Sequence, residues 1–276
     1  MKWVSMADIR QLVADLEAEV STLAELVMKL ADDEWEHDTP ASGWTVAHQV
    51  AHLAHFDQVA ALAISDQARF QIVAAEAALD PQGYGAKVLL PYLARGPREL
   101  SATWVEAARY FRTVALRAEP GLRAPWFGLS MSVASLVTAR TMETWAHGQD
   151  IRDTVGLPPA SSDRLKSIVH LAIGARPYSY GVHDLAPVST PIRLELAAPD
   201  GSPWRWGPED AVNVIYGSAL DFCLVLTQRR HVLDTDLRAS GRDAAEWLAI
   251  GQTFAGKPGA GRRPGQFNLA PRPGPT

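Results

Sequence analysis

The chain has 276 residues, of which 47% are hydrophobic and 21% charged, a composition that supports a packed core in one large or two ordinary domains. The net charge of −5 excludes the basic footprint expected of a protein that binds nucleic acid or an anionic membrane surface. Cys223 is the only cysteine, the N-terminus lacks a signal-peptide core, and no apolar run is long enough to span a membrane, so we expect a cytoplasmic protein without internal disulfides.

Four segments of the N-terminal half repeat apolar residues at helical spacing and predict long helices. Thr45 is the expected N-cap of the second helix, and Pro97 is a favourable first-turn residue for the third. Residues 81–91 and 119–128 are expected to be loops. The predicted helices cover residues 6–31, 45–78, 97–118 and 131–155. Four long helices joined by short breaks predict a mainly α fold whose first domain, residues 1–158, is a four-helix bundle.

The pattern changes after Pro158-Pro159, where a smaller α+β domain is expected over residues 159–256. Residues 192–197 alternate with period two and predict a strand, and the turn signal Pro199-Asp-Gly-Ser leads into Trp204-Arg-Trp206. Helices are predicted over residues 162–175, 209–229 and 242–254. Residues 257–276 are rich in Gly and Pro and are expected to form an irregular tail.

Two short motifs place metal-ligand side chains on predicted helices. Glu143 and His147 are four residues apart, which places them on one helical face about 5–6 Å apart at Cβ. The other motif holds His48, His52 and His55, which cannot all point at one ion, and His52 is the expected ligand. Two imidazoles and one carboxylate leave a coordination position open, as in catalytic zinc sites, although the same set also suits ferrous iron. Surface or hydrogen-bonded core histidines are the structural alternative.

Charged and aromatic residues flank these motifs. Asp150 or Asp57 is a candidate acceptor for the second ring N–H of a ligand histidine, and Arg140 precedes Glu143 by three residues. The structural alternative for these groups is charge on a helix surface. Trp126-Phe127-Gly128 is a candidate aromatic rim over the mouth of the bundle, or an ordinary cap on its core.

Arginines end the predicted helix that contains Cys223. Cations are favoured at a helix C-terminus, but the guanidinium groups of Arg229 and Arg230 also suit a carboxylate-bearing substrate. Cys223 itself is expected to be a small buried residue rather than a nucleophile. The phosphate-binding, dinucleotide-binding and serine-hydrolase motifs are absent from the sequence.

The motifs together resemble the mycothiol-dependent maleylpyruvate isomerase family, whose N-terminal half is a DinB-like metal-binding four-helix bundle. The resemblance starts at Gly43-Trp44-Thr45-Val46 and Val50-Ala51-His52-Leu53 and continues through Glu143-Thr-Trp-Ala-His147-Gly-Gln-Asp150. It extends through Gly217 to Arg229 and reaches Phe254, so it covers nearly the whole chain.

This resemblance implies a zinc ion on His52, Glu143 and His147, a small thiol such as mycothiol, and a catalytic arginine at Arg229. The family places that arginine after a glycine, where this chain has Gln228. A thiol bound to a divalent metal is deprotonated at neutral pH. The implied activity is therefore cis–trans isomerisation of, or thiol addition to, an activated unsaturated carboxylate.

Two other functions remain open at this level. One is a hydrolase or lyase in which metal-bound water reacts, and the other is a metal-binding protein without catalysis. The expected partners are a small anionic substrate and, in the case of a homodimer, a second copy of the chain.

Overall fold

The computed structural model describes residues 9–186, 188–256, 258–259 and 261–267. The chain divides into two compact units, residues 1–160 and 161–276. The expected mainly α fold with a smaller α+β part is confirmed. Residues 268–276 of the predicted tail and the start of the first predicted helix lie outside the described residues.

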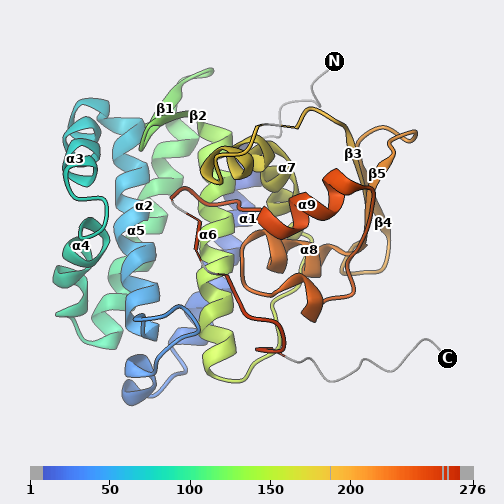
Figure 1. The fold of residues 1–276 in the computed structure, drawn as a ribbon. Coiled ribbons are helices and arrows are strands. Elements are labelled where there is room, and N and C mark those ends of the chain that lie inside the picture. The colour runs from blue at the N-terminus through green and yellow to red at the C-terminus, as the bar shows by residue number, and fades with distance from the viewer. Residues whose placement is uncertain (1–8, 187, 257, 260, 268–276) are drawn as a thin grey trace. The chain divides into compact units, whose positions relative to one another are not determined.

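A bundle of four long helices forms the first unit (Figure 1). The helices are α1 (Ile9–Val27), α2 (Val46–Ser65), α5 (Pro97–Arg117) and α6 (Val133–Thr154). In α1, buried side chains recur at three- and four-residue spacing, among them Val13, Leu16 and Val20. Burying one such leucine contributes on the order of 2 kcal/mol, so the apolar stripe that predicted the helix also holds it in the bundle.

The predicted helix over residues 45–78 is wrong in its length, although Thr45 is its N-cap as predicted. Ser65 ends α2, and Asp66 then caps a separate helix α3 (Gln67–Leu79) by accepting a hydrogen bond from the backbone N of Arg69 at 3.1 Å. An aspartate at an N-cap satisfies a free backbone N–H, which favours a new helix start over continuation.

Both loops predicted in the first unit contain regular structure. Helix α4 (Tyr84–Leu93) occupies most of the first, and the 3-10 helix η1 (Asp32–Glu36) precedes α2. The second holds a hairpin of β1 (Arg123–Trp126) and β2 (Leu129–Ser132). Its two turn residues, Phe127 and Gly128, both have positive φ, of 34° and 86°. Positive φ at both positions matches the twist of the flanking strands, at a steric cost for phenylalanine.

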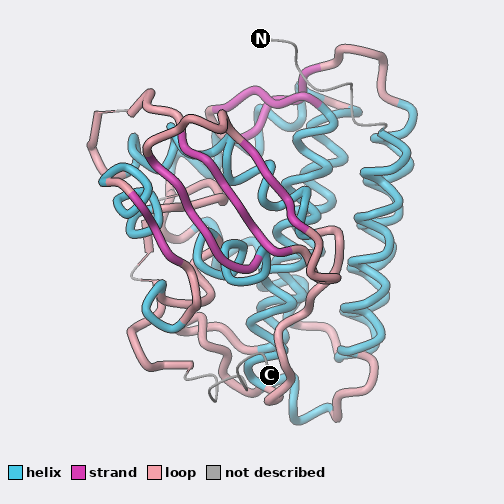
Figure 2. The backbone as a smooth tube through the Cα atoms, turned by 90° about the vertical axis from the view of Figure 1, so that its right-hand side faces the viewer, coloured by secondary structure: helices cyan, strands magenta, loops and turns pink. Residues whose placement is uncertain are grey.

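The second unit contains a four-stranded sheet, drawn in magenta in Figure 2. Its order is β4-β3-β5-β6, with β3 and β5 parallel and the outer pairs antiparallel. The strands are β3 (Ile192–Ala197), β4 (Pro203–Trp206), β5 (Asn213–Ser218) and β6 (Arg238–Ser240). The helices are α7 (Leu165–Val182), α8 (Ala219–Leu226) and α9 (Arg242–Ile250), with a 3-10 helix η2 (Val232–Asp234). The prediction for β3 is confirmed. The helix predicted over residues 209–229 is confirmed only where α8 lies, and residues 213–218 form strand β5 instead.

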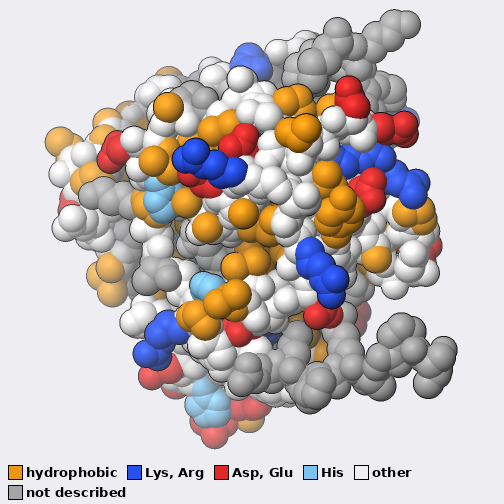
Figure 3. Space-filling view, turned by 45° about the vertical axis from the view of Figure 1, so that its right-hand side comes forward, with side chains coloured by type: hydrophobic (Ala, Val, Ile, Leu, Met, Phe, Trp, Pro, Cys, Tyr) orange, Lys and Arg blue, Asp and Glu red, His pale blue; other side chains and the backbone are white. Residues whose placement is uncertain are grey.

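Surface charge on the described residues is mixed in sign. On the face seen in Figure 3, acidic and basic side chains are interspersed among apolar ones. No helix in the described part of the chain is long and apolar enough to cross a membrane.

Candidate metal centre

Helices α2 and α6 bring together His52, Glu143 and His147. One potential ligand atom from each residue lies within 4.8 Å of the other two. Oε2 of Glu143 is 3.1 Å from Nε2 of His147 and 3.5 Å from Nε2 of His52. Because α2 packs against α6, a residue about ninety positions away in the sequence completes the pair that is four residues apart on α6.

Burial and neighbouring groups shift the pKa values of His52 and Glu143. The side chains of His52 and Glu143 are 18% and 21% exposed, and that of His147 is 10% exposed. Burial, followed by the neighbouring His147, lowers the pKa of His52 to about 3. Burial would raise the pKa of Glu143, but the close contacts of its carboxylate with His147 and His52 favour the charged form and hold this pKa well below its ordinary value. A neutral imidazole beside an ionised carboxylate has the protonation that metal ligation requires.

Gln49 is a site residue that the sequence did not single out. It is fully buried on α2, and its Oε1 contacts Nδ1 of His147. Its Nε2 donates to the hydroxyl of Thr39 at 2.8 Å. One feature of the sequence could have identified Gln49 as a site residue. It lies three residues before His52, and residues three apart share a helical face.

Asp57 and Asp150 were predicted to accept a hydrogen bond from the second ring N–H of a ligand histidine, and for His147 this prediction is wrong. Its two ring nitrogens face Gln49 and Glu143. Both oxygens of Asp57 are also occupied, by Nε of Arg140 at 2.7 Å and by Nε1 of Trp104 at 3.2 Å. Burial raises the pKa of Asp57, although Arg140 and Trp104 favour its charged form.

The structural alternative, in which Asp57, Arg140 and Asp150 are charges on a helix surface, is wrong. Asp57 and Asp150 are fully buried, and Arg140 is 1% exposed. The Asp57–Arg140 ion pair instead links α2 to α6 inside the bundle. Removing one member of such a pair leaves an uncompensated buried charge.

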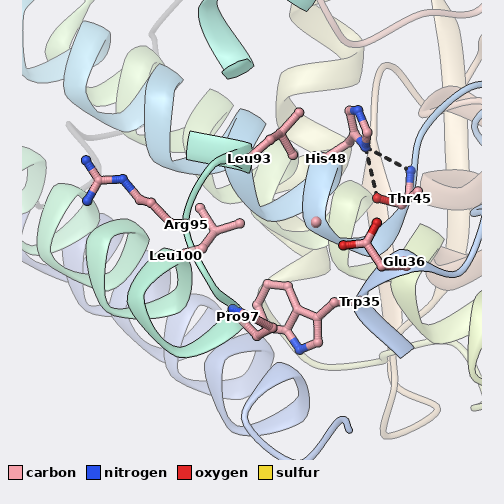
Figure 4. A pocket seen from close by; sticks show the side chains of 9 residues that line it. Trp35, Glu36, Thr45, His48, Leu93, Arg95, Pro97 and Leu100 are labelled. Atoms are coloured by element: carbon pink, nitrogen blue, oxygen red, sulfur yellow. Dashed lines mark hydrogen bonds between the residues drawn. The ribbon is translucent and has the colours of Figure 1, made fainter. Parts of the chain in front are cut away.

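The structure separates His48 and His55 from the cluster. Nδ1 of His48 contacts the hydroxyl of Thr45 at 2.9 Å and its backbone N at 3.3 Å, which closes the first turn of α2. Figure 4 shows the His48 ring with these two bonds, lining a pocket together with Glu36. Nε2 of His55 is 3.4 Å from the hydroxyl of Tyr84, and burial lowers the pKa of His55 to about 4.

Aromatic rings surround the cluster. The ring of Trp44 stacks on that of His147, with centroids 5.8 Å apart and planes 15° apart, and lies 5.3 Å from the ring of His52. The ring centroid of Phe56 lies 4.5 Å from that of His52 and 6.0 Å from that of Phe127 in the hairpin. The predicted aromatic rim thus reaches the cluster through Phe56.

Comparisons with known proteins locate this bundle in a family. Residues 16–152 match the model described as "Mycothiol maleylpyruvate isomerase N-terminal domain", a span that contains all three clustered residues. Uncharacterized proteins of two Mycobacterium tuberculosis strains, MT0041 and Rv0036c, are each 44% identical over 257 residues, covering 93% of this chain and the whole of each relative. The chain belongs to the mycothiol maleylpyruvate isomerase family.

Two crystal structures of the mycothiol-dependent maleylpyruvate isomerase, one of them of a mutant, share the fold of this family member. Each has a TM-score of 0.56 and covers 84% of this chain and 92% of its own. The sequence identities are 13% and 14%, so the likeness concerns the fold.

Arg229 lies in the second unit, just after α8. Gln228, where the family resemblance expects glycine, has a φ of 60°, in the region that glycine favours. The backbone therefore makes a glycine-like turn at Gln228. Nη1 of Arg229 donates to the carbonyl of Thr227 at 2.6 Å.

The neighbours of Arg229 are more deeply buried. Arg230 is 4% exposed, and its guanidinium lies 4.1 Å from the ring centroid of Phe267. Cys223 is fully buried, and burial raises the pKa of its thiol well above the ordinary value. A thiol held in this neutral form is a poor nucleophile, in agreement with the sequence prediction.

Proposed function

We propose that this protein is a zinc-dependent enzyme that uses a small, mycothiol-like thiol to isomerise, or add to, an activated unsaturated carboxylate. The observation that carries the proposal is the convergence of His52, Glu143 and His147 within 4.8 Å. Two imidazoles and one carboxylate suit zinc, and three protein ligands leave a position open for the thiol. Membership of the mycothiol maleylpyruvate isomerase family supports the thiol and the reaction class.

When bound, the ion would lower the pKa of the thiol and supply a thiolate at neutral pH. The residues of the chain have separate tasks. His52 presents a nitrogen lone pair because burial disfavours its charged form, His147 offers a second imidazole nitrogen, and Glu143 contributes negative charge. Trp44 and Phe56 flank His52 with flat apolar surfaces, which exclude water and suit a planar conjugated substrate.

The proposed reaction is balanced without an external oxidant or reductant. When bound, the thiol would supply a nucleophile that adds reversibly to the double bond, so that the carbon–carbon bond could rotate before the thiol is released unchanged. Retention of the thiol together with its proton would instead give the addition product. We assign the substrate carboxylate to Arg229, since guanidinium groups bind carboxylates in a fork-like geometry.

Replacing zinc by cobalt tests whether the thiol binds to the metal ion. Adding the cognate thiol to cobalt-loaded protein is expected to produce a sulfur-to-metal charge-transfer band in the near-ultraviolet spectrum. The Glu143→Ala variant is the control and should give no band. Absence of the band at saturating thiol, together with turnover that needs no thiol, would instead indicate a hydrolase or lyase.

Arginine variants test whether Arg229 binds the carboxylate of the substrate. Arg229→Ala is expected to keep its metal and fold while losing about ten- to a hundredfold in kcat/KM, because a charge-assisted hydrogen bond is worth about 1.5–3 kcal/mol. Arg238→Ala, which removes an exposed arginine of β6, is the matched control and should retain activity. Arg230 is a poor control, since its buried side chain packs on Phe267. Equal, minor losses in Arg229→Ala and Arg238→Ala would show that Arg229 only caps α8.

A further inference from the structure

A chain of hydrogen bonds leads from the backbone before α2 to the cluster. The hydroxyl of Thr39 is 2.8 Å from the carbonyl oxygen of Trp44 and 3.5 Å from that of Ala41. The same hydroxyl is 2.8 Å from Nε2 of Gln49, whose Oε1 contacts Nδ1 of His147. Thr39 is 8% exposed and Gln49 is fully buried, so water does not compete freely for these bonds.

The direction of each bond follows from counting donors and acceptors. A carbonyl oxygen only accepts, so Thr39 must give its single hydroxyl proton to the backbone. Thr39 then has only lone pairs left for Gln49, which must present its NH2 group. The amide oxygen of Gln49 is thereby turned toward His147, and since that oxygen only accepts, Nδ1 must carry a proton. A neutral His147 then has its free lone pair on Nε2, the nitrogen that faces Glu143.

We infer that Thr39 and Gln49 are positioning residues that fix the Nδ1–H tautomer of His147 and so reserve its Nε2 for the metal. The inference rests on the proposed metal centre. Trp44 contributes to the position of the His147 ring in two ways. Its carbonyl oxygen accepts the hydroxyl proton of Thr39, and its indole ring stacks on the imidazole of His147. Helical spacing places Gln49 on the face of His52, but it does not predict the partners of Gln49, since Thr39 lies outside any helix and His147 is 98 positions away.

A neutral amide at this position has an electrostatic consequence. A carboxylate partner would raise the basicity of the ligand histidine and add negative charge near the ion. Gln49 orients the ring without that charge. The ligand set therefore carries a single negative charge, from Glu143, and a bound ion keeps more of its capacity to acidify a thiol.

The test compares zinc affinities by chelator competition. Thr39→Val removes the hydroxyl with little change in shape, which leaves Gln49 free to turn over, and should weaken zinc binding about tenfold. Thr39→Ser restores the hydroxyl and should bind within about twofold of the original protein. Thr138→Val is the matched control, because the buried hydroxyl of Thr138 bonds only within its own helix, to the carbonyl of Ala134. Its zinc affinity should not change.

A double-mutant cycle separates orientation from a general loss of packing. In a Gln49→Met background no amide remains for Thr39 to orient, so Thr39→Val should cause no further loss. In zinc-loaded protein, the Nδ1 proton of His147 should exchange slowly in NMR spectra and faster after Thr39→Val. Equal zinc affinity in Thr39→Val and the original protein would overturn this inference alone. Failure of the original protein to bind zinc would overturn the metal centre as well.

Discussion

Glu143→Ala is expected to empty the metal centre. Glu143 is the residue whose carboxylate lies between both imidazoles, at 3.1 and 3.5 Å. Its removal should lower zinc affinity by more than the roughly 10- to 100-fold that loss of an outer hydrogen-bond partner costs. Elemental analysis of purified protein should find about one divalent ion per chain originally, as expected for one three-ligand site, and close to none in this variant.

The other histidines provide the controls for this result. His52→Ala and His147→Ala should lose metal as Glu143→Ala does, while His48→Ala and His55→Ala should keep it. His48 closes the first turn of α2, so its removal should lower stability modestly without touching the ligand set. Loss of metal in His48→Ala together with its retention in His52→Ala would show that the ligand assignment is wrong.

Asp57→Ala is expected to destabilise the protein by about 3–5 kcal/mol, measured as the free energy of unfolding in urea. The variant leaves the guanidinium of Arg140 buried without its partner, and it also removes the acceptor of Trp104 Nε1. A loss of this size is a large share of the about 5–15 kcal/mol that stabilises a typical domain.

Two comparisons test the cause of that destabilisation. Combining Asp57→Leu with Arg140→Met replaces both charges by apolar groups and should recover much of the loss, because no unpaired charge remains. Arg109→Ala breaks a pair with Glu106 on the exposed face of α5 and should change stability little. If the double variant is no more stable than Asp57→Ala, the destabilisation comes from lost packing rather than from the unpaired charge.

Sequence alone predicted the long helices well, because each carries a continuous apolar stripe. It failed in the two predicted loops of the first unit, which contain α4 and the β1–β2 hairpin, and at two boundaries where one element runs directly into the next. Asp66 separates α2 from α3 through a single capping bond. Strand β5 likewise runs directly into α8, where Ser218 caps the helix by accepting from the backbone N of Asp221 at 2.9 Å. Such boundaries depend on which backbone groups need partners, and apolar periodicity does not report that.

The candidate metal centre was predictable only where local helix geometry determines which side chains lie together. Glu143 and His147 share one helical face by local geometry alone, and the family resemblance implied His52. Gln49 and the Asp57–Arg140 pair depend on which faces of α2 and α6 meet in the bundle. Tertiary packing decides that, so the sequence left Asp57 and Arg140 open between a role beside the ligand histidines and charge on a helix surface, whereas the structure pairs them inside the bundle.

The division of the chain at residue 160 has a consequence for protein engineering. Every side chain of the cluster, and each partner described for it, lies between Thr39 and His147, in the first unit. Arg229 belongs to the second. Under the proposed function, substitutions in residues 161–276 would change how the substrate carboxylate is bound and leave the proposed metal ligands untouched. Substrate preference and metal binding could then be altered separately, in different halves of the sequence.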